Sequence, residues 1–443
     1  MSLIYVFPIT SCLDLSSAPL RLSYFRMHRR WPADSRTRIA VIFTKIAVYC
    51  LSLVLVALRP CVRVRVGFAY SSRFGHLFWN HDLMALETTK GERPIITVLL
   101  WDHKREASHE GARLVRTALD QGFLHIVIHR LPFLSSIEHQ IGAMSELPTI
   151  LGEHFIDMRS YHRDVSGARP AAQPLISSLH LDVLKEELSG PVNEYLTRCT
   201  GKVLVALVVR DWTYHGVKGD DFRNPPIESF IPMVEFLIQS GFAVVRLGRS
   251  QQAFPFESEF FMDQAIDHEA PDSTDLYLGH LACTHIIAGD GYMGFSAVQR
   301  KRIIFVNETY LPFLPSDSIR YLHLPARLFY KQSGRLLKID EMASLYEKIL
   351  QDPHLIHSSD TYNNLGIGFA FNSESDIVAA VKQHLRGSLP VAVKHDVVRQ
   401  SWFKMQESLA DAALGQFAHG NEPIFSACFA DVYIEKYADL LCD

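Results

Sequence analysis

Apolar strands and amphipathic helices alternate along most of this chain. The unbroken apolar run 203–209 indicates a strand buried on both faces, as a parallel sheet requires. A helical pattern follows at 227–238 and ends at Gly241. Pro232 lies in its first turns, where it either bends the helix or marks a later start. The apolar stretch 242–248 then predicts a second strand and completes a βαβ unit.

The same alternation continues on both sides of this unit. It predicts further strands at 61–67, 95–100, 124–128, 285–289 and 302–307, the last being the final core strand. Further helices are predicted at 109–119, 275–282, 339–350, 374–385, 397–414 and 429–441. We therefore predict an α/β fold of two Rossmann-like domains facing a central cleft. The domains would span 61–195 and 196–390 with a border near 190–202, and the C-terminal helices of 391–443 would pack back on the first domain.

Charged residues gather where the first strand of the second domain ends. Arg210 and Asp211 follow it directly, and Asp221, Arg223 and Asn224 come next. Ligands bind at the carboxyl ends of strands in open parallel sheets, and an Arg guanidinium suits phosphate. The pattern therefore predicts a phosphate or ribose site, with an Arg–Asp surface pair as the alternative.

Two further strand ends support the ligand interpretation. The strand 242–248 delivers Arg246 and Gly248, and the turn 289–294 reads Gly-Asp-Gly-Tyr-Met-Gly. A Gly-rich strand-to-helix turn lets backbone N–H groups approach a diphosphate, although such glycines are often structural. The turn is neither a phosphate loop with Lys-Ser/Thr nor a dinucleotide fingerprint, which disfavours ATPase and dehydrogenase functions.

At these residues the chain resembles a bacterial family assigned as glycosyltransferases and associated with surface-polysaccharide and flagellar glycosylation loci. The matching residues are Val209-Arg210-Asp211 with Tyr214, Asp221-Phe222-Arg223-Asn224, Val245-Arg246-Leu247-Gly248, Ile266-Asp267 before Asp275-Leu276-Tyr277-Leu278, the Gly-Tyr-Met-Gly turn, Phe305-Val306-Asn307, and upstream Arg73-Phe74-Gly75-His76-Leu77. The chain departs from the family where Val209 replaces a more frequent His, and 91–200 show little match. The resemblance implies a GT-B-like fold and a nucleotide-sugar donor.

These observations define a candidate site for sugar transfer. The donor-binding candidates are Arg210, Asp211, Arg223, Asn224, Arg246, Gly248, Asp290, Gly291, Gly294 and Asn307. Asp290 would contact ribose or sugar hydroxyls, and Asn307 would either close the far wall or cap its strand. His76 lies in the first strand-to-helix loop and is the candidate general base. Asp211 and Asp221 are its rivals, and a purely structural His76 is the alternative.

The sequence has no Asp-x-Asp motif, so we expect a metal-independent, hexosyltransferase-like enzyme that needs no cofactor besides its nucleotide-sugar substrate. The acceptor would be a glycan, a lipid-linked molecule or a protein. Two other functions remain open at this point. One is a nucleotide-sugar isomerase or hydrolase on the same fold. The other is a non-catalytic nucleotide-sugar-binding protein of a polysaccharide assembly complex.

Composition and charge narrow the possible functions further. A net charge of −4 over 443 residues, with no dominant basic stripe, argues against a general nucleic-acid binder. Seven scattered cysteines form neither a zinc signature nor a disulfide framework, which fits a reducing compartment.

The N-terminal 60 residues differ from the rest because Arg-rich sequence precedes the apolar segment 39–58. That segment is long enough to cross a bilayer, and Lys45 near one end can reach the interface. Arginines on both sides give no clear orientation. A spanning helix, a helix lying on the membrane surface and a buried helix of the first domain are the three interpretations. The expected location is the cytoplasmic face of the inner membrane, or the cytoplasm.

Overall fold

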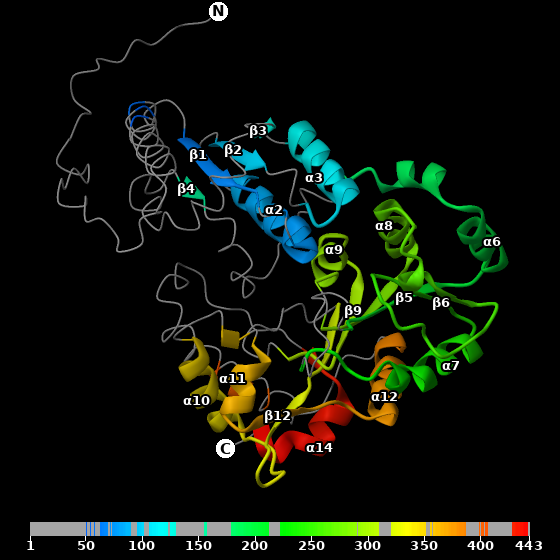
Figure 1. Ribbon diagram of the computed structural model, residues 1–443, viewed down its shortest axis with the longest axis vertical. Helices are drawn as coiled ribbons and strands as arrows, with labels where there is room; N and C mark the ends of the chain where they lie inside the picture. The colour runs from blue at the N-terminus through cyan, green and yellow to red at the C-terminus, as the bar shows by residue number, and fades with distance from the viewer. Residues whose placement is uncertain are drawn as a thin grey trace, which may run out of the picture.

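The computed structural model describes two parallel sheets with their helices (Figure 1). Apart from short isolated positions, the described residues are 63–69, 73–89, 95–101, 106–122, 125–129, 155–156, 179–211, 222–289, 291–309, 320–350, 358–386 and 428–441. Most of 39–58 and of 397–414 lie outside them. None of the described helices combines the length and the apolar composition needed to cross a bilayer.

The N-terminal sheet has the strand order β3-β2-β1-β4, and its pairs are parallel. Its strands are β1 (Arg63–Phe68), β2 (Ile95–Trp101), β3 (His125–His129) and β4 (Phe155–Ile156). Helix α2 (Phe74–Thr89) follows β1, and α3 (His109–Gly122) follows β2. The strands and the helix predicted in this region are confirmed, with ends shifted by a few residues.

The C-terminal sheet has the order β13-β10-β9-β8-β5-β6-β7 and is parallel throughout. Its strands are β5 (Leu204–Val209), β6 (Ala243–Arg246), β7 (Phe261–Asp263), β8 (Thr284–Ala288), β9 (Arg302–Val306), β10 (Tyr321–Leu324) and β13 (Cys428–Phe429). A separate antiparallel pair joins β11 (Arg327–Tyr330) to β12 (Ile367–Ala370). The strand predicted to be the last is therefore not the last, because β10 and β13 extend the sheet beyond β9.

Both faces of the C-terminal sheet are buried, which accounts for the unbroken apolar run in β5. Val205, Leu207 and Val209 pack into one hydrophobic core. Leu204, Ala206 and Val208 pack into the other, because successive side chains of a strand point to opposite faces. The prediction of a doubly covered strand is confirmed.

Different helices cover the two faces of this sheet. The first face carries α7 (Ile231–Gln239), α10 (Ile339–Leu350), α12 (Glu374–Leu385) and α14 (Asp431–Leu441). The second carries α6 (Gly190–Arg198), α8 (Asp272–Leu281) and α9 (Met293–Val298), together with α2 and α3 from the N-terminal half. One core therefore joins the helices of the two halves.

The structure decides where one predicted helix starts, and it contradicts one predicted packing. Residues 227–230 form a 3-10 turn and α7 begins only at Ile231, so Pro232 lies in the first turn of α7, where its missing N–H costs no hydrogen bond. We also predicted that 391–443 pack back on the first domain. Instead, β13 pairs with β10 and α14 contacts α12, so the described part of this segment belongs with the C-terminal sheet (Figure 1).

Each sheet has one point where the direction of strand addition reverses. The chain runs from β1 through β2 to β3 on one side, whereas β4 pairs with β1 on the other. It likewise runs from β5 through β6 to β7, and β8 then pairs with the opposite edge of β5. Ligands of open parallel sheets bind at such points, outside the carboxyl ends of the strands. The N-terminus of α2 lies at the first point, and the turn before α9 lies at the second.

These two points meet in a backbone contact between three glycines. A Cβ added to Gly294 would lie 2.2 Å from the carbonyl oxygen of Gly75, and one added to Gly75 would lie 2.5 Å from that of Gly291. Real Cβ atoms do not approach other atoms so closely, so α2 and α9 can pack in this way only because these residues lack side chains. The central cleft between two domains, which we predict from the sequence, stays a prediction.

A methyl group at this contact should separate α2 from α9. We expect Gly294→Ala to lower the free energy of unfolding by about 1–3 kcal/mol, the usual cost of overpacking, measured by thermal or denaturant unfolding. Gly190→Ala is the matched control, because nothing lies within 4 Å of the position of its added Cβ. Equal stability of the two variants would contradict the described contact.

Candidate functional site

Arg210 and Asp211 lie where β5 ends, beside the end of β8. The Arg210 backbone N–H donates to the Ala288 carbonyl at 3.2 Å, which continues the pairing of the two strands one residue beyond β5. Only 8% of Arg210 is exposed, whereas Asp211 is half-buried. Both predicted donor residues therefore lie at the reversal point of the C-terminal sheet.

Residues 222–224 follow Asp221 in the sequence and lie beside the same carboxyl ends of the strands. The Phe222 ring stacks on Phe369 of β12 with 4.6 Å between ring centroids, which anchors the segment. The Arg223 carbonyl lies 2.7 Å from where a Gly289 side chain would begin, and Gly289 has a φ of +67°. Arg223 is buried and Asn224 half-buried at this place. The sequence-predicted cluster thus comes together here as far as it is described; Asp221 and Asp290 lie outside the described residues.

The glycine turn is fixed by aromatic and polar contacts on both sides. The Tyr292 ring stacks on Phe74 of α2 with 5.3 Å between centroids. The Tyr292 hydroxyl donates to the Asp275 carbonyl at 2.7 Å, and the Asp275 carboxylate accepts from the Gly248 N–H at 3.0 Å. Gly248 has a φ of +103°, which a side chain would strain. Gly248 therefore joins the turn through Asp275, a residue that sequence reasoning did not place in the site.

His76 lies in the first turn of α2, next to the glycine contact. Its Nδ1 lies 3.2 Å from Oδ1 of Asn80, one turn further along the helix. With that oxygen as acceptor, Nδ1 carries the proton of the neutral ring and the lone pair lies on Nε2. The ring is half-buried. An imidazole held by a second side chain in this way has a fixed orientation, as a general base needs.

His285 of β8 is a useful contrast, because it lies beneath the same turn but cannot serve as a base. Its ring is fully buried, with Nδ1 2.5 Å from the Ser296 hydroxyl and Nε2 2.9 Å from the Gly279 carbonyl. Burial, together with the positive charge of Lys301, lowers the pKa of His285 to about 3. Both ring nitrogens are occupied by the protein, so His285 supports the turn rather than acting on a ligand.

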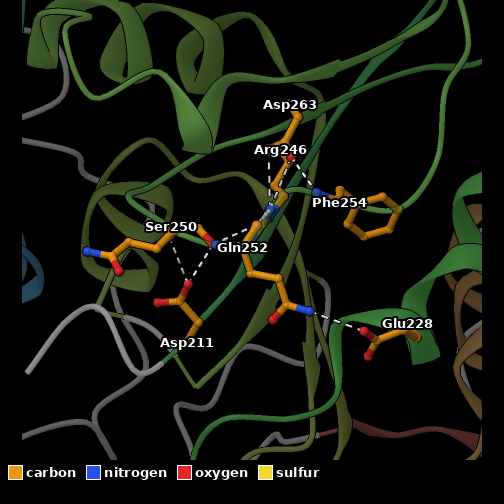
Figure 2. A network of polar contacts seen from close by, with 8 residues as sticks. Asp211, Glu228, Arg246, Ser250, Gln252, Phe254 and Asp263 are labelled. Atoms are coloured by element: carbon orange, nitrogen blue, oxygen red, sulfur yellow. Dashed lines mark hydrogen bonds and ion pairs between the residues drawn. The ribbon is translucent and has the colours of Figure 1, made fainter. Parts of the chain in front are cut away.

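Arg246 lies inside the protein rather than at the surface of the site. The side chain is 0% exposed, and Figure 2 shows it among Ser250, Gln252 and Asp263. Its Nη1 donates to the Gln252 carbonyl at 2.8 Å and pairs with the Asp263 carboxylate at 3.2 Å, and its Nη2 donates to the Ser250 hydroxyl at 2.7 Å. Burial lowers the pKa of Arg246, whereas Asp263 raises it. This guanidinium is committed to its own loop, which argues against the direct phosphate contact that the sequence predicts.

Asn307 is similarly committed. It has a φ of +56° and is 1% exposed, and its Oδ1 accepts from the backbone and side-chain N–H groups of Asn372 at 2.7 and 2.8 Å. The Asn372 amide also donates to the carbonyls of Leu324 and Pro325. Asn307 thus ties the end of β9 to the ends of β10 and β12, which fits the strand-cap interpretation.

Sequence reasoning missed the partners that give these residues their roles. Asp263 is in register with Arg246 on the neighbouring strand β7, so the ion pair was predictable only if that three-residue strand had been recognised. The Gly75 contact had a weak signal, because Gly75 belongs to the Arg-Phe-Gly-His stretch. Asn372 had none.

Neither a protein-family model nor a curated protein matches this sequence. Several solved structures resemble the model. The ADP-heptose lipopolysaccharide heptosyltransferase II of E. coli aligns with 60% of this chain and 90% of its own, at 11% identity and a TM-score of 0.33. A glycosyl transferase of family 9 from Veillonella parvula covers 73% and 97%, at 10% identity and a TM-score of 0.40. A protein named as a UDP-N-acetylglucosamine 2-epimerase from Listeria monocytogenes covers 74% and 98%, at 10% identity and a TM-score of 0.27. All three TM-scores are below 0.5.

If Arg246 is a buried structural cation, removing its charge should destabilise the fold. We expect Arg246→Met to lower the free energy of unfolding by about 3–5 kcal/mol, because Asp263 would be left without its partner. Denaturant unfolding monitored by circular dichroism measures this. The control is Arg335→Met, which breaks the exposed Arg335–Glu341 pair and should have a much smaller effect. A stable Arg246→Met protein that has lost only phosphate affinity would restore the direct-contact interpretation.

Proposed function

We propose that this protein is a glycosyltransferase that moves a sugar from a nucleotide-sugar donor to a hydroxyl group of a glycan, a lipid-linked molecule or a protein. The observation that carries the proposal is the meeting of the two strand-reversal points at Gly75, Gly291 and Gly294. Each point is a place where a parallel sheet binds ligands. One site made from both can hold two substrates together, which a transfer between them requires.

In this proposal the donor lies against the C-terminal sheet. Its diphosphate faces Arg210 and the backbone N–H groups of the turn 289–294, because a guanidinium and peptide dipoles stabilise phosphate charge. The acceptor lies on the N-terminal side, next to the first turn of α2. Arg246 and Asn307 hold the loops of the donor site in place and do not themselves contact the donor.

The proposed reaction uses His76 as the base. Nε2 takes the proton of the acceptor hydroxyl while the acceptor oxygen bonds to the anomeric carbon of the sugar. The bond between that carbon and the diphosphate breaks in the same step. Arg210 and the turn stabilise the negative charge left on the diphosphate, so the proposed reaction uses no metal ion. Direct attack of this kind inverts the anomeric configuration.

The proposal is tested first on the donor. Thermal unfolding is measured with a panel of UDP-, GDP- and ADP-sugars, and we expect at least one to raise the unfolding temperature. That donor then serves as the substrate for the variant below. No shift with any of them would contradict the assignment of a nucleotide-sugar donor.

His76→Ala separates binding from chemistry. We expect it to leave the donor dissociation constant unchanged, because the donor contacts lie on the C-terminal sheet, and to lower the transfer rate by about 10²–10⁴, the usual contribution of a general base. His109→Ala is the control, since His109 is an exposed histidine at the start of α3. Full activity of His76→Ala would shift the assignment of the base to Asp221. Joint loss of donor binding and activity would make His76 structural.

A further inference from the structure

A chain of hydrogen bonds leads from the interior of the protein to the proposed donor site. The residue at its outer end indicates which part of the donor is bound there. Arg246 donates to the Ser250 hydroxyl at 2.7 Å, and that hydroxyl donates to Oδ2 of Asp211 at 2.5 Å. The Gln251 backbone N–H donates to the same oxygen at 3.2 Å. A buried cation thus acts on a half-exposed carboxylate through one hydroxyl.

The buried end of this network is rigid. Arg246 is 0% exposed and Ser250 is 1% exposed. The other side of the guanidinium is held by Asp263, whose carboxylate also accepts the Phe254 N–H at 2.7 Å. Ser250 Oγ accepts from Arg246 and has one proton, for which the Gln252 carbonyl at 2.9 Å and Asp211 at 2.5 Å are the two acceptors. The shorter contact, to a carboxylate that only accepts when ionised, identifies Ser250 as the donor to Asp211.

The outer end of the network is Asp211, at the carboxyl end of β5. A carboxylate repels a diphosphate but accepts the hydroxyl hydrogens of a sugar diol. In dinucleotide-binding sheets an acidic residue about 20 residues after the glycine-rich turn hydrogen-bonds a ribose hydroxyl, so a carboxylate near the carboxyl ends of parallel strands suits this role. A fixed carboxylate loses less entropy on binding than a mobile one, so its orientation by Ser250 contributes to affinity.

We infer that Asp211 binds the ribose 2′- and 3′-hydroxyls of the donor nucleotide, and that Ser250 is the residue that positions its carboxylate, with Arg246 acting through Ser250. This inference rests on the proposed function, and it names the part of the donor that the residue recognises. It also gives Arg246 a role that involves no contact with the ligand.

The test compares each nucleotide with its 2′-deoxy counterpart. The probes are UDP, GDP and ADP and their 2′-deoxy forms, and isothermal titration calorimetry gives the dissociation constants. For the nucleotide that binds, we expect the wild-type protein to prefer the ribose form by about ten- to hundredfold, as for a hydrogen bond to a charged group. Ser250→Ala and Asp211→Asn should reduce that preference to about threefold or less. They should weaken binding of the 2′-deoxy form less than binding of the ribose form, because the 2′-deoxy form keeps only the 3′-hydroxyl contact.

Ser240→Ala is the matched control. Ser240 is exposed between the end of α7 and the start of β6, at the amino end of that strand and away from the site. Asp211→Asn keeps the shape of the side chain, so it tests the ribose contact even where Ser250→Ala fails to fold. Equal affinities of the wild-type protein for ribose and 2′-deoxy forms would overturn the inference. So would a Ser250→Ala protein that binds both forms more weakly at an unchanged ratio, because Ser250 would then be only structural. If no nucleotide binds at all, the proposed function fails, and this inference with it.

Discussion

The contact between Gly75 and the turn before α9 is the constraint on which the arrangement of the site depends. The N-terminal ends of α2 and α9 touch there through backbone atoms, and a side chain at Gly75 or Gly294 would separate them. The surrounding aromatic groups strengthen the contact, since Phe74 stacks on Tyr292 and Phe78 meets Phe295 edge-on at 4.9 Å. The position of His76 relative to the donor loops follows from this packing, because His76 is the next residue along α2.

Buried ion pairs also hold together the elements around this contact. Asp82 of α2 is fully buried and lies 3.7 Å from the guanidinium of Arg300, just after α9. A buried pair of this kind contributes specificity of arrangement more than net stability, since both groups lose hydration. It joins the two halves close to the glycine contact. Arg246 and Asp263 do the same within the C-terminal sheet, where they fix the loop after β6.

The elements that sequence reasoning predicted well are those whose signal is local. The apolar run of β5 and the amphipathic pattern of α12 depend on residues next to one another, and both were recovered within a residue or two. The roles of Arg246 and Asn307 depend on Asp263 and Asn372, which short or irregular segments bring to them. An arginine at the end of a strand has the same local pattern whether it faces a ligand or a buried carboxylate. The groups that surround the guanidinium distinguish the two cases, and those groups come together only in the assembled sheet.

The central claim is that one ligand site is formed by both sheets. Amide hydrogen exchange, measured with and without a saturating nucleotide sugar, tests it most directly. The account predicts slower exchange in two separate segments, residues 73–77 at the start of α2 and 291–294 at the start of α9, because the ligand would lie against both. Protection confined to the C-terminal sheet and its loops would contradict the account, since the N-terminal half would then take no part in the site.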